Sequence, residues 1–186
     1  MSRKVVIVLA AVILLCIIVL LILLTCMPKT CHDTDIAKYQ YWQDSVTKTV
    51  EKEFAPALPA RETVEAYGKE YNYSFSQGAL GAPNFVIYVS LQFPDKESYE
   101  KELEKYSTLL TNPIQQNNDC HYAVQYSLEK VAAYTDEEIR DGMFYNFELI
   151  STNENEYVIS FLVARVWDYY KNDFLADYLV SVRDSA

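Results

Sequence analysis

The sequence predicts an α+β protein in which an amino-terminal transmembrane helix precedes one extracytoplasmic domain. Every residue from Val5 to Leu24 is apolar. Downstream, segments with alternating apolar residues, typical of strands, lie among segments whose apolar residues recur every three or four positions, typical of helices. A polar turn between two late strands indicates a hairpin. We therefore expect a mainly antiparallel sheet with three to four helices.

The apolar run has the length of a membrane span. Its twenty residues, at about 1.5 Å each, match the roughly 30 Å hydrocarbon core of a bilayer. Arg3 and Lys4 precede the run, and basic flanks stay in the cytoplasm. The sequence thus predicts a single-pass protein of the cell membrane whose carboxyl-terminal part lies outside. We expect a cytoplasmic tail at 1–4, a transmembrane helix or uncleaved signal anchor at 5–25, a juxtamembrane linker at 26–33 and the extracytoplasmic domain at 34–186.

Two alternatives to an uncleaved span place the domain on the same side. The residues Leu23, Leu24, Thr25 and Cys26 resemble a bacterial lipobox, which would make Cys26 the lipidated residue of a lipoprotein. An ordinary cleaved signal peptide is the other alternative, although its apolar region is usually only about 7–15 residues long. Under all three interpretations the bilayer is a partner of the amino-terminal segment.

Composition and charge exclude several functions. The chain carries 16 Lys and Arg against 26 Asp and Glu, and its first 26 residues hold two of the basic residues and none of the acidic ones. The remaining chain is therefore strongly acidic, which disfavours nucleic acid because binding it requires a basic patch. The four glycines do not have the spacing of nucleotide-binding loops, and two histidines cannot form the common zinc motifs. We expect no cofactor and no metal.

The periodicity predicts the following order of elements. An amphipathic helix spans 36–54, and a proline-containing connector follows at 55–60. We expect strands at 63–76 and 84–93, the second covered on both sides, and a charged helix at 95–110 capped by Asp95. A strand follows at about 122–128, although 127–134 could equally be helical. A short helix from a capping box at 135–138, strands at 143–151 and 156–167 around a turn at 152–155, and a helix at 172–182 complete the domain.

Cys31 and Cys120 are the candidate disulfide. Cysteines outside the membrane commonly pair, and Cys16 and Cys26 lie within or at the edge of the predicted span. A disulfide between Cys31 and Cys120 would close the long segment between them and would stabilise the folded domain by roughly 4–5 kcal/mol in the chain-entropy model. Two free thiols are the alternative, whereas the neighbouring histidines do not give a usual zinc spacing.

The aromatic residues supply the candidate ligand-binding surface. All tyrosines and tryptophans lie beyond residue 26, and tyrosine combines rigid contact area with a polar tip that suits recognition. The alternative is that these rings fill strand faces in the core. The candidate binding residues are Tyr67, Tyr71, Tyr73 and Tyr88 on the first two strands, and Trp167, Tyr169 and Tyr170 after the hairpin.

Catalytic motifs are sparse. Ser45 with Lys48, and Ser127 with Lys130, have the spacing of a nucleophile motif that resembles that of penicillin-binding proteins and β-lactamases, but the partner motifs of that family are absent from the sequence. Acidic residues on the helix 95–110 offer pairs for acid–base work, although they alternate with lysines as on a solvated face.

The sequence therefore favours a membrane-anchored module that binds a protein, a peptide or an envelope polymer. The alternative is a small extracytoplasmic hydrolase that uses a carboxylate pair or a Ser/Lys pair. An enzyme should have a deep pocket with convergent ionisable groups, whereas a binding module should have a shallow, aromatic-rich face.

Overall fold

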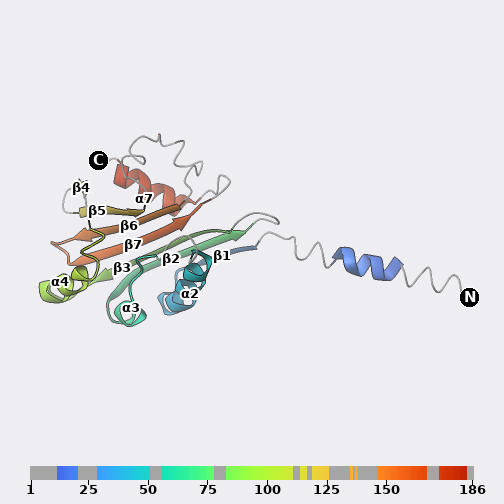
Figure 1. The fold of residues 1–186 in the computed structure, drawn as a ribbon, viewed down its shortest axis with the longest axis horizontal. Helices are drawn as coiled ribbons and strands as arrows, with labels where there is room; N and C mark the ends of the chain where they lie inside the picture. The colour runs from blue at the N-terminus through green and yellow to red at the C-terminus, as the bar shows by residue number, and fades with distance from the viewer. Residues whose placement is uncertain are drawn as a thin grey trace, which may run out of the picture.

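The fold is built on one antiparallel sheet. A computed structural model describes residues 12–20, 29–50, 56–77, 83–110, 114–116, 119–125, 135, 137, 146–166 and 172–183. Within these residues, seven strands pair in the order β1-β2-β3-β7-β6-β5-β4, and every neighbouring pair is antiparallel (Figure 1). The predicted α+β class and the mainly antiparallel sheet are confirmed.

The elements follow one another in two groups. The first consists of β1 (Lys29–Asp33), the 3-10 helix η1 (Ile36–Lys38), α2 (Tyr39–Val50), α3 (Arg61–Tyr67), β2 (Gly68–Gln77) and β3 (Asn84–Gln92). The second consists of α4 (Lys96–Glu104), β4 (Ile114–Gln116), β5 (Asp119–Gln125), β6 (Asn146–Asn153), β7 (Val158–Arg165) and α7 (Asp173–Arg183). Residues 12–20 form a further helix.

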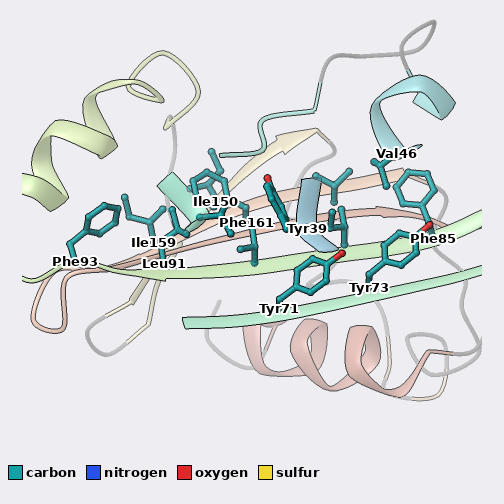
Figure 2. Packing of buried hydrophobic residues seen from close by; sticks show 14 of the residues in the cluster. Tyr39, Val46, Tyr71, Tyr73, Phe85, Leu91, Phe93, Ile150, Ile159 and Phe161 are labelled. Carbon is teal, nitrogen blue, oxygen red and sulfur yellow. The ribbon is translucent and has the colours of Figure 1, made fainter. Parts of the chain in front are cut away.

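Helices cover both faces of the sheet. We call the side covered by α2, α3 and α4 the first face and the side covered by α7 the second face. On the first face, Phe85, Leu91 and Phe161 pack with Tyr39 of α2 and Tyr99 of α4, and Figure 2 shows Tyr39 and Phe161 among these side chains. The prediction that the strand at 84–93 is covered on both sides is confirmed.

The second face has a smaller apolar cluster. Leu149 and Leu162 of the sheet pack against Leu175 and Leu179 of α7, and all four side chains are buried. The last helix was predicted at 172–182, and its observed bounds agree closely. Amphipathic spacing explains this agreement, because burial of one stripe stabilises a helix wherever a complementary apolar face exists.

Helices α2 and α4 form as their local sequences predict. In α2, Tyr39 and Val46 are buried, and the Tyr39 hydroxyl donates to the carbonyl oxygen of Pro59 at 2.7 Å. In α4, the Asp95 carboxylate accepts a hydrogen bond from the Ser98 amide at 2.8 Å, as expected of an N-cap. The helix predicted at 36–54 is confirmed over α2, with the 3-10 helix η1 before it. The helix predicted at 95–110 is confirmed at its start but is wrong at its end, because α4 ends at Glu104 and turns occupy 105–109.

The predicted juxtamembrane linker is wrong in its second half, because residues 29–33 form β1. This edge strand pairs with β2 from Lys29 opposite Gln77 to Asp33 opposite Tyr73. Asp33 then attaches β1 to the helices, since its carboxylate accepts from the Trp42 indole at 3.0 Å and pairs with Lys38 at 3.1 Å. The sheet therefore begins within a few residues of the predicted membrane span.

The strand predicted at 63–76 is wrong at its start, where α3 runs to Tyr67. An ion pair between Arg61 and Glu65 at 2.6 Å supports the helix with i,i+4 spacing, and Val64 is buried. Gly68 then allows the close passage from helix to strand, because a Cβ there would lie 2.3 Å from the side chain of Ile36.

The predicted hairpin is confirmed with a shifted turn. Register pairing of Asn153 with Val158 extends β6 by two residues, so the turn occupies 154–157 instead of 152–155. Tyr157 has a φ of 55°, a left-handed conformation that closes this turn. Strand β4 was not predicted. The capping-box helix lies mostly outside the described residues.

The predicted membrane span is described only over residues 12–20. These residues are helical, and the side chains of Ile13, Leu14 and Leu15 are more than half exposed. In the part of the chain that the structure describes, no helix has both the length and the apolar character that crossing a bilayer requires. The span at 5–25 stays a prediction.

Candidate ligand-binding groove

An open groove lies between α3 and α4, where β2 begins and β3 ends. Its more enclosed part has a volume of about 370 Å³ and continues into a wider part of about 640 Å³. Ala66, Tyr67 and Phe93 line both parts. The other lining residues are Glu62, Thr63, Ser98, Lys101, Glu102 and Lys105 in the enclosed part, and Gly68, Lys69, Gln92 and Pro94 in the wider part.

Two aromatic rings form the floor of the groove. Tyr67 and Phe93 have ring centroids 4.7 Å apart and an interplanar angle of 41°. Phe93 is buried and contacts Tyr99 of α4, whereas Tyr67 is only half-buried. Tyr67 therefore presents an accessible ring that its neighbours hold in place, as a recognition surface requires.

The wall formed by α4 carries charge. Glu102 is buried, and its carboxylate pairs with Lys105 at 2.5 Å, as the i,i+3 spacing predicts. Burial, together with the nearby Glu102, raises the pKa of the Tyr106 hydroxyl. Glu97 and Lys101 are four residues apart on α4 but do not form an ion pair, and Lys101 makes none with any described residue. The groove thus exposes a cationic side chain beside its aromatic floor.

The structure separates the predicted binding tyrosines. Tyr71 and Tyr73 belong to the core of the first face, where Tyr73 stacks on Trp42 at 4.3 Å and burial raises the pKa of the Tyr71 hydroxyl. Tyr88 faces the opposite side and packs in the cluster under α7. Of these four tyrosines, Tyr67 alone lines the groove. Trp167, Tyr169 and Tyr170 lie outside the described residues.

The predicted disulfide is not formed in this structure. Cys31 on β1 and Cys120 on β5 are both free. Four strands lie between them in the sheet, which corresponds to a separation on the order of 24 Å at about 4.8 Å per strand. Bridged cysteines have Cα atoms within about 7 Å of each other, so the sheet order is incompatible with this bridge. Cys26 lies outside the described residues.

Glu148 is a buried acid that sequence reasoning missed. Its side chain on β6 is 1% exposed, and burial raises its pKa to about 7. The Ala57 amide donates to Oε1, whereas Oε2 is buried without a hydrogen-bond partner among the described residues. The available signal was a charged residue placed between Phe147 and Leu149 in a strand covered on both faces.

Of the catalytic alternatives from the sequence, the carboxylates of the helix 95–110 reach the groove through Glu102, which lines its enclosed part with Glu62 of α3, whereas the Ser/Lys pair does not. Glu148 does not line it, and neither do Ser45 and Lys48, which both lie on α2. Ser127 and Lys130 lie outside the described residues. Among the residues that are described, no group of three or more His, Cys, Asp or Glu side chains is placed to hold a metal ion.

Comparison with protein-family models, with curated proteins and with solved structures finds no match for this chain.

Proposed function

We propose that this protein is a membrane-anchored, extracytoplasmic module that binds a protein, a peptide or an envelope polymer in the groove between α3 and α4. The observation that carries the proposal is the half-buried Tyr67 ring on Phe93 at the floor of an open groove. Aromatic floors in open grooves suit recognition, whereas enzymes generally enclose their substrates among convergent ionisable groups.

The register of the sheet supports an outward-facing groove. Lys29, which follows the proposed anchor, pairs with Gln77, whereas the groove lies at the other end of β2 beside Gly68. Because β2 has ten residues, its ends are about 30 Å apart. In Figure 1, α4 lies at the opposite end of the sheet from the start of β1. A groove at this distance is accessible to a partner that is not embedded in the bilayer.

A photo-crosslinking experiment tests the groove. A benzophenone amino acid replaces Ala66, which is exposed and lines both parts of the groove, in the full chain expressed in its native membrane. Tyr41 of α2 is the matched control position, because it is 66% exposed and lies outside the groove. We expect one defined adduct from position 66 that position 41 does not give and that Tyr67→Ala weakens at least tenfold. Equal adducts from both positions, or no adduct from position 66, would refute the proposal that the groove binds a partner.

A separate experiment tests the anchor and its orientation. Protease added to spheroplasts should digest the region 29–186, and alkaline carbonate should leave the intact chain in the membrane pellet. Protection of the region in sealed cells would overturn the orientation, and release by carbonate would overturn the anchor.

A further inference from the structure

A row of polar side chains crosses the second face of the sheet. In register, Ser90 of β3 lies opposite Ser160 of β7, Ser160 opposite Ser151 of β6, and Ser151 opposite His121 of β5. All four are at least nine-tenths buried. The row therefore places a histidine and a serine directly across one pair of strands, where backbone pairing determines their proximity.

Hydrogen bonds link the end of this row to α7. The His121 Nδ1 atom lies 2.7 Å from the Ser151 hydroxyl, which lies 2.6 Å from the Tyr178 hydroxyl. Both bonds can be satisfied in either of two proton orders, and in one of them Tyr178 donates to Ser151 and Ser151 donates to an unprotonated Nδ1. This order of protons is the one in which a histidine base activates a serine nucleophile.

We propose that Ser151 is the nucleophile of an acyl-transfer site, with His121 as its general base. Oγ of Ser151 attacks the carbonyl carbon of an ester while its proton moves to Nδ1 of His121. The C–O bond to the leaving alcohol then breaks, and the alcohol takes that proton. Water, activated by the same imidazole, hydrolyses the acyl-serine and releases the acid and free Ser151.

The surroundings favour a short acyl chain. Ser151 is 8% exposed, so the approach to its Oγ atom is narrow. Asn153, two residues further along β6 on the same face, is only half-buried, as is Tyr178. Under this proposal an acetyl-sized group reaches Oγ along this end of β6, and the Tyr178 hydroxyl donates to the oxygen that gains negative charge.

This activity is separate from binding in the groove. Tyr67 packs on the first face of the sheet, whereas Ser151 and Tyr178 belong to the second. Loss of one activity therefore leaves the other measurable.

A fluorophosphonate probe tests the proposal on the full chain in detergent. Attack by Ser151 forms a P–O bond and expels fluoride, so peptide mapping should find the phosphonyl adduct on Ser151. Ser151→Ala should remove the adduct, and His121→Gln should slow labelling about 100-fold, the usual contribution of a general base. The same variants should lose hydrolysis of p-nitrophenyl acetate.

Ser160 provides the matched control. It has the same 8% exposure as Ser151 but bonds to Ser90 and Tyr88 instead of a histidine. Ser160→Ala should be labelled at Ser151 at the rate of the unsubstituted chain. The proposal is overturned if Ser151 is unlabelled in the folded chain, if Ser160 is labelled equally, or if His121→Gln does not slow labelling. Mapping on the unsubstituted chain decides the question even if a variant fails to fold.

Discussion

Replacing the buried Glu148 with glutamine should stabilise the protein at neutral and alkaline pH. Glu148 is 1% exposed, with a pKa raised from 4.5 to about 7 by burial. The folded state therefore holds a proton between pH 4.5 and 7 that the unfolded state has lost, so stability falls as the pH rises through this range.

The magnitude follows from the two pKa values. The difference between 4.5 and about 7 corresponds to about 3 kcal/mol of unfolding free energy. Glutamine carries no charge and keeps an oxygen that can accept from the Ala57 amide, as Oε1 does. We expect Glu148→Gln to exceed the unsubstituted protein in stability by about 1–3 kcal/mol at pH 8 and to lose most of this advantage near pH 4.5.

Urea unfolding of the full chain in detergent, followed by tryptophan fluorescence from pH 4.5 to 8, measures this difference. Glu104→Gln is the matched control, because Glu104 is exposed on α4. Its stability should follow that of the unsubstituted chain at every pH. If the stability of Glu148→Gln also runs parallel to that of the unsubstituted chain from pH 4.5 to 8, then ionisation of the buried carboxylate costs no stability at high pH. This result would contradict the prediction.

Three further predictions concern stability and use the same unfolding assay. Asp33→Asn should cost about 1–2 kcal/mol at pH 7, because hydrogen bonds from Trp42 and the Asp35 amide lower the Asp33 pKa to about 2; this contribution is present above pH 3.8 and is lost as the pH falls towards 2. An effect that persists unchanged at pH 2 would contradict the ionic explanation. Asp95→Ala should cost about 1 kcal/mol by removing the N-cap of α4, whereas Asp95→Asn should cost less. Leu179→Ala should cost about 2–5 kcal/mol because Leu179 of α7 is 0% exposed in the cluster between that helix and the sheet; a cost below about 1 kcal/mol would show that α7 does not pack on the sheet.

Local patterns predicted those elements whose stability depends on nearby residues. Helix α2 follows from apolar residues at helical spacing and α4 from the Asp95 cap, while the β6–β7 hairpin follows from alternation around a polar turn. The apolar pattern gave a wrong prediction at Arg61–Tyr67, where it indicated the start of a strand but a short helix precedes β2. Apolar spacing over so few residues does not separate a helical turn from a strand, and in the folded chain Val64 of this helix is buried in the core of the first face.

The candidate sites were only partly predictable. Tyr67 was among the residues expected to bind ligand and does line the groove, but its pairing with Phe93 depends on the meeting of α3 with the end of β3. The juxtaposition of His121 with Ser151 depends on register between β5 and β6. No motif joins residues thirty positions apart, so sequence reasoning missed this pair.

Taken alone, the sequence determined the α+β class, the acidic character of the chain after residue 26 and the apolar amino-terminal run, because composition and short-range periodicity encode these features. The order of strands was decided by the tertiary structure, and with it the separation of Cys31 from Cys120. It also decided that, of the candidate tyrosines at 67, 71, 73 and 88, only Tyr67 lines the groove, whereas the other three pack in the core. The physical reason is that hydrophobic burial is non-directional. An apolar stripe indicates that a surface is buried in the folded protein, but only the tertiary structure shows which residues cover it.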